Sequence, residues 1–134
     1  MKTGGCLCGS VRYEFAGEPA FVGGCYCKDC QKESGSGHNV IAAVPEAALK
    51  MLGGATRNFV AKGGSGKEIT RVFCPNCGTT LFSRPQVMPG MLMVRLGTID
   101  DSSGYTRGMN IFCSHARDWD APAANVTGHA RMPG

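Results

Sequence analysis

The chain has 134 residues, of which 43% are hydrophobic and 18% charged, and its formal net charge is +4. These values are typical of a globular domain, and no apolar run is long enough to form a transmembrane helix. The lysines and arginines are scattered and form no run or stripe, so we expect neither a nucleic-acid nor a membrane partner.

The segments between the turns mostly alternate apolar and polar residues or are rich in β-branched residues, which is typical of strands. In chain order, the strands that we expect cover residues 11–16, 20–22, 39–44, 57–60, 68–73, 79–82, 91–99 and 110–113. One helical turn is expected over 45–50, because Pro45 suits the first helical position. We therefore predict a single, mainly β domain over residues 1–134, with its last ten residues loosely held.

The N-terminus has no hydrophobic stretch behind Lys2, so it does not resemble a secretory signal. We therefore expect a cytoplasmic, reducing location. In such a compartment clustered cysteines bind metal more often than they form disulfides. A disulfide framework is accordingly disfavoured, and the cysteines are interpreted first as metal ligands.

Seven of the eight cysteines lie in three short clusters, Cys6–Cys8, Cys25–Cys30 and Cys74–Cys77. A structural zinc site takes four protein ligands, whereas a catalytic zinc keeps three and leaves one position open. Seven ligands divide naturally into four and three. This division predicts one closed site that stabilises the fold and one open site that can receive a ligand.

The first and third clusters share a feature, because Gly9 and Gly78 directly follow their second cysteines. Glycine accepts positive φ, so the backbone can turn under a metal and point its amides at the sulfurs. This pattern is typical of a zinc knuckle. Two such knuckles predict a closed structural site whose four ligands are Cys6, Cys8, Cys74 and Cys77.

The middle cluster differs, because Cys25, Cys27 and Cys30 come from one short segment and no glycine follows them. Three ligands from one loop leave the opposite side of a metal open to an external thiol or water. Lys28 and Lys32 flank the cluster and would offset the negative charge of its thiolates. The cluster is therefore our candidate for the open site.

Two other interpretations of the cysteines remain open at this stage. A zinc ribbon would pair Cys27-x-x-Cys30 with Cys74-x-x-Cys77 and leave the other three clustered cysteines over. The Cys74-x-x-Cys77 spacing also suits a dithiol redox motif, but that motif opens a helix, whereas residues 78–82 indicate a turn and a strand.

The remaining candidates are single residues. Cys113 lies in an apolar segment, where a small buried hydrophobe is favoured over a fourth ligand or a reactive thiol. His38, eight residues after the middle cluster, is a candidate ligand or general base, and His115 is a second candidate beside the open site. His129 is expected to be exposed.

Taken together, several segments resemble the glutathione-dependent formaldehyde-activating enzyme (GFA) family, which includes the centromere protein V domain. The resemblance runs from about residue 4 to residue 120 and is carried by three cysteine motifs in this order. Tyr26 and Cys113 depart from the family pattern around the second metal. The matching segments are Gly5-Cys6-Leu7-Cys8-Gly9-Ser10-Val11-Arg12-Tyr13-Glu14, Cys25-x-Cys27-x-x-Cys30-Gln31-Lys32-x-Ser34-Gly35, Arg71-x-Phe73-Cys74-x-x-Cys77-Gly78-Thr79, Gly97-Thr98-Ile99-Asp100 and a late Trp119.

The resemblance implies a β-tent fold of small antiparallel sheets around two zinc sites per chain. It favours the division into four and three ligands over the ribbon pairing. It also implies a reaction in which glutathione, as co-substrate, adds to formaldehyde to give S-(hydroxymethyl)glutathione. That activity belongs to the carbon–sulfur lyases, which are named for the reverse direction.

Within this resemblance, we expect a glutathione sulfur to fill the open position beside the catalytic cysteines Cys25, Cys27 and Cys30 and to attack an aldehyde or related electrophile. Lys28, Lys32 or Arg12 would bind the glutathione carboxylates. The alternatives are a zinc-dependent thiol carrier and a structural interaction domain, neither of which has turnover.

Overall fold

The computed structural model describes residues 1–133, and within them it contains ten strands and one α-helix. The expected mainly β fold is therefore confirmed. The residues group into two compact units, one formed by 1–20 and 42–103 and the other by 21–41 and 104–134. Each unit contains one of the candidate metal centres. The expectation of one domain over the whole chain stays a prediction.

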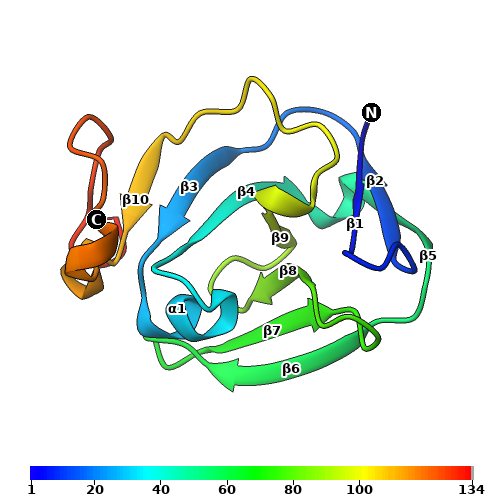
Figure 1. Ribbon diagram of the computed structural model, residues 1–134, viewed down its shortest axis with the longest axis horizontal. Coiled ribbons are helices and arrows are strands. Elements are labelled where there is room, and N and C mark those ends of the chain that lie inside the picture. Colours follow the sequence, from blue (N-terminus) through cyan, green and yellow to red (C-terminus); the bar gives the residue numbers. More distant parts are fainter. Residues whose placement is uncertain (134) are drawn as a thin grey trace. The chain divides into compact units, whose positions relative to one another are not determined.

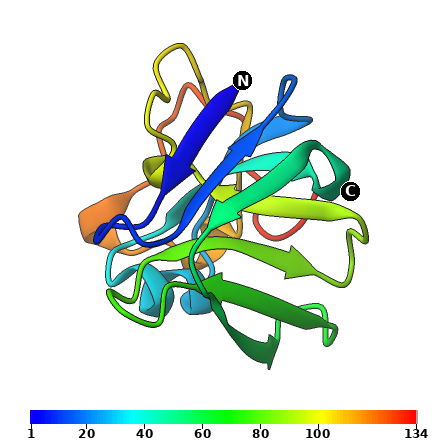
Figure 2. The same ribbon diagram turned by 90° about the vertical axis from the view of Figure 1, so that its right-hand side faces the viewer.

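The first unit contains a three-stranded antiparallel sheet in the order β1-β2-β5. Figure 2 shows β1 and β2 lying side by side in blue. The side chains of Tyr13 and Phe15 are fully buried and alternate with the half-buried Arg12 and Glu14, which is the period that the sequence shows. These strands span Lys2–Gly5 (β1), Arg12–Phe15 (β2) and Leu49–Gly53 (β5).

The same unit contains a second run of strands in the order β4-β9-β8-β7-β6, of which the last residues of β4 belong to this unit. Leu81, Leu92 and Val94 of β8 and β9 are fully buried and form its core. At the edge, β6 is exposed on both faces. These strands span Asn39–Pro45 (β4), Arg57–Lys62 (β6), Glu68–Phe73 (β7), Thr80–Pro85 (β8) and Met91–Arg95 (β9).

The second unit is built on two strands and the helix. β3 (Phe21–Cys25) pairs with β10 (Met109–Ile111), and the pairing is parallel, so the strands of this protein are not all antiparallel. Figure 1 shows β10 beside β3, with α1 (Lys28–Ser34) following β3 along the chain. Short 3₁₀ turns at Cys113–His115 and Asp118–Asp120 come after β10.

Several sequence expectations differ from the structure. The expected strand over 91–99 ends at Arg95 and continues as a 3₁₀ turn, Leu96–Thr98. The segment treated as a cysteine loop contains α1, and β1 and β5 were not expected. The expected helical turn after Pro45 is a 3₁₀ turn, Glu46–Ala48.

The expectation of a loosely held C-terminus was wrong for the described part of the last ten residues. The amide of Asn110 donates to the carbonyl of Thr127 over 2.8 Å, and the amide of His129 donates to the carbonyl of Asn110 over 2.8 Å. The amide of Cys113 binds the carbonyl of His129 over 3.0 Å. The segment is held because it supplies partners for backbone groups beside β10.

No helix among residues 1–133 is long and apolar enough to cross a membrane.

The buried position of Leu81 gives a stability prediction. Leu81→Ala removes a fully buried side chain from β8 and should lower the free energy of unfolding by about 2–5 kcal/mol. Leu7→Ala is the matched control, because Leu7 is 88% exposed; it should change stability by less than about 0.5 kcal/mol. Urea unfolding of the metal-loaded proteins measures both, and equal effects would contradict this assignment of the core.

Candidate metal centres

The first centre is built on two matching backbone turns in the first unit. Gly9 and Gly78 adopt φ angles of 82° and 80°, which only glycine adopts without strain. Their amides donate to the carbonyls of Cys6 and Cys74 over 3.1 and 2.8 Å. The turns that the Cys-Gly pairs predicted are therefore present in both clusters.

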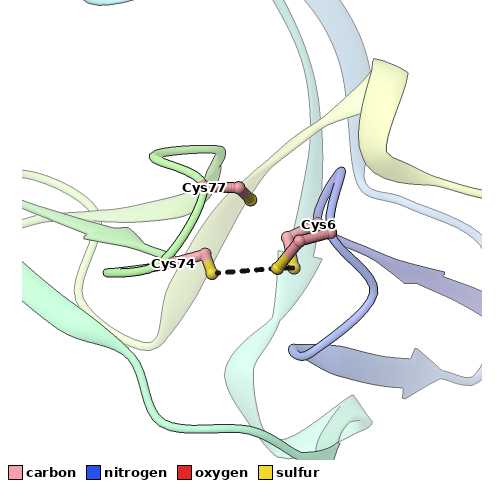
Figure 3. A group of neighbouring side chains, drawn as sticks. Cys6, Cys74 and Cys77 are labelled. Carbon is pink, nitrogen blue, oxygen red and sulfur yellow. Dashed lines mark hydrogen bonds between the residues drawn. The ribbon is translucent and has the colours of Figure 1, made fainter.

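The sulfurs of Cys6, Cys8, Cys74 and Cys77 all lie within 4.8 Å of one another. Figure 3 shows Cys74 and Cys77 on the loop after β7, facing Cys6 on the loop after β1. The Sγ atoms of Cys6 and Cys8 are 3.6 Å apart, and those of Cys8 and Cys74 are 3.8 Å apart. Tetrahedral zinc with Zn–S bonds of about 2.3 Å requires sulfurs about 3.8 Å apart, so the four thiols fit zinc.

Hydrogen-bond donors surround these sulfurs. The amide of Val11 donates to the Cys6 sulfur over 3.2 Å. The Ser10 hydroxyl lies 3.2 Å from the Cys8 sulfur, and it is the main cause that lowers the Cys8 pKa to about 7. The Thr79 hydroxyl, 3.3 Å from the Cys77 sulfur, lowers the Cys77 pKa to about 5. The surroundings of Cys8 and Cys77 therefore favour the thiolates that bind metal, whereas burial and the Cys77 side chain raise the Cys74 pKa.

The second centre lies in the second unit, where Cys25 ends β3, Cys27 caps α1 and Cys30 lies in its first turn. The three sulfurs lie within 4.8 Å of one another. The amide of Cys30 donates to the Cys27 sulfur over 3.3 Å, so the start of the helix fixes the spacing of two ligands. Within residues 1–133, no fourth cysteine, histidine or carboxylate joins this group.

The three thiols of the second centre share hydrogen bonds unequally. Donation from the thiols of Cys25 and Cys30 lowers the Cys27 pKa. The Cys25 pKa is raised, first by its hydrogen bond to Cys27. The Cys30 pKa is raised by its hydrogen bonds to Cys25 and Cys27 and by burial. These shifts favour the thiolate form of Cys27 and the protonated forms of Cys25 and Cys30.

The two halves of the cysteine pattern thus form two separate groups, one in each unit. Two comparisons with known proteins bear on this arrangement. The family model described as "Glutathione-dependent formaldehyde-activating enzyme" matches residues 1–115. The chain belongs to the glutathione-dependent formaldehyde-activating enzyme family. A crystal structure of a Rhodobacter sphaeroides protein is similar in fold, with a TM-score of 0.59 and 20% sequence identity over 76% of this chain and 91% of that chain.

The cationic residues expected at the open GFA site lie in different settings. Lys28 and Lys32 are exposed and one helical turn apart on α1, so they share a face of the helix. Arg12 lies in the first unit, where its guanidinium makes two hydrogen bonds to the Asp100 carboxylate. Those bonds lower the Asp100 pKa, and Thr3 donates to the same carboxylate over 2.8 Å. The guanidinium of Arg12 is therefore bound to Asp100 in this structure.

Neither ring nitrogen of His38 is free. Nδ1 is bound to the Asp120 carboxylate, and Nε2 lies 2.8 Å from Nη2 of Arg107. Because arginine only donates, Nε2 must accept, and the proton of a neutral imidazole is assigned to Nδ1. In this arrangement His38 can neither bind a metal nor accept a proton from a substrate.

His115 and Cys113 lie in the turn that follows β10. This turn begins at Phe112, which has a φ of 54°, a value rarely adopted by residues other than glycine. Nδ1 of His115 is buried and has no hydrogen-bond partner among residues 1–133. Cys113 is only partly buried, and its thiol donates to the Asn110 carbonyl over 3.6 Å. It therefore belongs neither to the expected strand nor to the three-sulfur group.

Sequence reasoning missed the residues that surround the second centre. Arg107 and Asp120 contact His38 from positions 69 and 82 residues away. Neither has a motif or a spacing that would single it out. Gln31 was visible only as the residue that follows Cys30, although its amide binds two backbone carbonyls.

The first centre predicts a selective effect of cysteine substitution. Cys77→Ser removes one of four ligands from a closed site, so the chain should lose the metal held there and part of its folded stability. Cys113→Ser is the control, because Cys113 lies outside both groups and should leave metal content unchanged. Metal analysis and circular dichroism measure both properties. A Cys77→Ser protein that keeps its full metal content and stability would exclude this ligand set.

The second centre predicts a steep pH dependence. Because the raised pKa values of Cys25 and Cys30 keep both thiols protonated at neutral pH, zinc binding should release about two protons, with little contribution from Cys27. Affinity should therefore rise with pH, by about 100-fold per unit near neutrality. Chelator competition between pH 6 and 8, on protein whose first centre is already loaded, measures the slope. A pH-independent affinity would contradict the assigned protonation.

Proposed function

We propose that this protein is a zinc-dependent enzyme that adds glutathione to formaldehyde and so forms S-(hydroxymethyl)glutathione, a carbon–sulfur lyase activity in the reverse direction. The observation that carries the proposal is the group of three thiols, Cys25, Cys27 and Cys30, which has no fourth ligand among residues 1–133. The family match over residues 1–115 supports the choice of thiol and aldehyde.

The three cysteines suit an open site rather than a closed one. Zinc held by three protein ligands leaves one position for an external group, and a thiol bound there is favoured as the thiolate at neutral pH. The partial exposure of all three cysteines is compatible with entry of a small thiol. A reducing compartment, as expected for cytoplasm, would keep the cluster free of disulfides.

The chain's own contribution to glutathione binding would come from α1. Glutathione carries two carboxylates, and Lys28 and Lys32 present two ammonium groups on one exposed face beside Cys27 and Cys30. Exposed ion pairs of this kind contribute about 0.2–1 kcal/mol each. Arg12 is engaged by Asp100, so the two lysines carry this part of the proposal.

The reaction forms one C–S bond between the glutathione sulfur and the formaldehyde carbon. The π electrons of the carbonyl move to its oxygen, which takes up a proton, while the thiol loses one. Cys25, Cys27 and Cys30 would hold the zinc that binds the thiol, and holding the nucleophile in position would lower the barrier. No oxidant or reductant is needed.

A thiol carrier without turnover is the second candidate, and one observation favours it. Both nitrogens of His38 are occupied, so this histidine supplies no proton transfer at the cluster. Thiols also add to formaldehyde without an enzyme. The third possibility, an interaction domain without turnover, would need neither the lysines nor the open position.

Binding is the first test. Zinc-loaded protein should take up glutathione in calorimetry, and one of two zinc ions per chain should become chelator-resistant. Cys27→Ser should abolish both effects, and Cys113→Ser should preserve them. Lys28→Gln with Lys32→Gln should raise the glutathione Kd by up to about fivefold per lysine, with little effect on cysteamine, which has no carboxylate.

Rate measurements separate the enzyme from the carrier. An enzyme must exceed the uncatalysed addition of glutathione to formaldehyde, and Cys27→Ser must remove the excess. Glutathione binding without excess rate would identify a carrier. One zinc ion per chain that is indifferent to glutathione would refute both and leave the interaction domain.

A further inference from the structure

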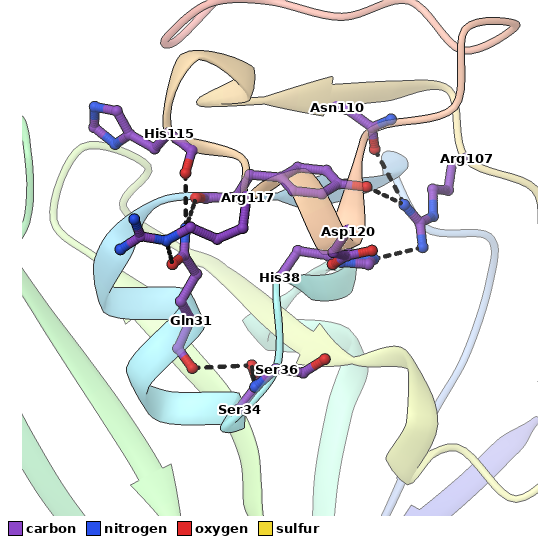
Figure 4. Close-up of polar contacts among 10 residues, drawn as sticks. Gln31, Ser34, Ser36, His38, Arg107, Asn110, His115, Arg117 and Asp120 are labelled. Carbon is purple, nitrogen blue, oxygen red and sulfur yellow. Dashed lines mark hydrogen bonds and ion pairs between the residues drawn. The ribbon is translucent and has the colours of Figure 1, made fainter.

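A cluster of polar side chains surrounds Tyr26, the residue between two of the three cysteines of the second centre. We call it the Tyr26 cluster. Figure 4 shows Asn110 on β10, Arg107 before that strand, Asp120 in the second 3₁₀ turn after it and His38 on the segment after α1. All of them belong to the second unit. Its members are Tyr26, His38, Arg107, Asn110 and Asp120.

Tyr26 is held at four points. Its ring is only 1% exposed and stacks on His38, with centroids 4.4 Å apart and planes 17° from parallel. Its hydroxyl accepts a hydrogen bond from Arg107 over 3.2 Å. Its amide donates to the carbonyl of Ile111 over 3.0 Å, and its carbonyl accepts from the amide of Gln31 over 2.9 Å. Few rotations of the Cys25–Cys27 backbone remain possible under these constraints.

The charges of the cluster balance. Asp120 binds Nδ1 of His38, and Nε2 of His38 accepts from Arg107, so a neutral imidazole links a carboxylate to a guanidinium. Arg107 also donates to the Asn110 side-chain oxygen over 3.4 Å. The side chains of His38 and Asp120 are 16% and 24% exposed, so these bonds are largely shielded from water. The arrangement uses every polar atom of His38 to hold its neighbours.

The Gln31 amide adds a second set of bonds. Its nitrogen donates to the carbonyls of both Tyr26 and His115 over 2.9 Å, and its oxygen accepts from Arg117 over 2.9 Å. Because Arg117 can only donate, this amide orientation is assigned without ambiguity. Gln31 thus joins the turn after β10 to the backbone between Cys25 and Cys27.

At Gly37 the backbone approaches the Asp120 side chain so closely that no Cβ atom fits between them. A Cβ atom at Gly37 would collide with the Asp120 carboxylate, the group that binds His38. Gly37 is buried and its φ is not in the left-handed region, so close approach is what requires glycine here.

We propose that His38 is a positioning residue of the second metal centre: with Asp120 and Arg107 it fixes Tyr26, and through Tyr26 the spacing of the Cys25 and Cys27 sulfurs. The inference rests on the proposed metal role of the three cysteines. Residues that orient metal ligands commonly change metal affinity by about 10–100-fold when they are replaced.

Cobalt(II) titration of the full chain, without glutathione, tests the proposal. His38→Phe keeps a ring to stack on Tyr26 but removes both hydrogen bonds. It should raise the Kd of the second cobalt ion by about 10-fold or more and shift its thiolate absorption bands. The first centre, in the other unit, should keep its Kd and spectrum. Asp120→Ala should act like His38→Phe, whereas Asp120→Asn keeps an acceptor for Nδ1 and should restore most of the affinity.

Glycine variants give a test that leaves the cluster residues unchanged. Gly37→Ala should displace Asp120 and weaken the second site, whereas Gly97→Ala, with no atom within 4 Å of the added Cβ, should not. If His38→Phe fails to fold, Gly37→Ala and Tyr26→Phe, which removes only the hydroxyl, decide the question. Folded variants with unchanged second-site Kd and spectrum would overturn the proposal. Loss of glutathione binding alone would count only against the proposed function.

Discussion

Four thiols gathered within 4.8 Å of one another are the constraint on which the first unit depends. Cys8 and Cys74 are separated by 66 residues, yet their sulfurs lie 3.8 Å apart. Thiolates at this distance repel each other unless a cation lies between them, and the lowered pKa values of Cys8 and Cys77 favour thiolates. A divalent metal would convert this repulsion into a cross-link between the start and the middle of the chain.

Both centres present cysteine sulfurs, but these sulfurs accept hydrogen bonds from different donors. In the first, hydroxyls and amides donate to the sulfurs and spread their charge, as Ser10, Val11 and Thr79 do. In the second, the Cys30 amide and the thiols of Cys25 and Cys30 all donate to the Cys27 sulfur, so that hydrogen bonds within the cluster favour one thiolate. The first arrangement suits a permanently bound metal. In the second, we propose that the Tyr26 cluster fixes the spacing of the cysteine sulfurs.

This difference bears on function. A catalytic centre needs an open position and ligands held in place. The three-cysteine group offers the first, and the hydrogen bonds that converge on Tyr26 provide a physical reason for the second. His38, which the sequence suggested as a general base, instead binds Asp120 and Arg107 through its two ring nitrogens. The proposed activation of a thiol by metal therefore does not use His38 as its base.

The amino-acid sequence by itself determined the three cysteine clusters and the turns at Gly9 and Gly78, because spacing and glycine turns are local properties of the chain. That the first and third clusters meet was decided by the tertiary structure. It also determined strands such as Glu68–Phe73, whose alternating pattern matches the observed bounds. Tertiary structure alone decided that Asp100 binds Arg12, that Asp120 and Arg107 hold His38, and that residues 127–131 bind the backbone beside β10. These contacts join residues far apart in the chain, and their partners are chosen by packing, which no local pattern records.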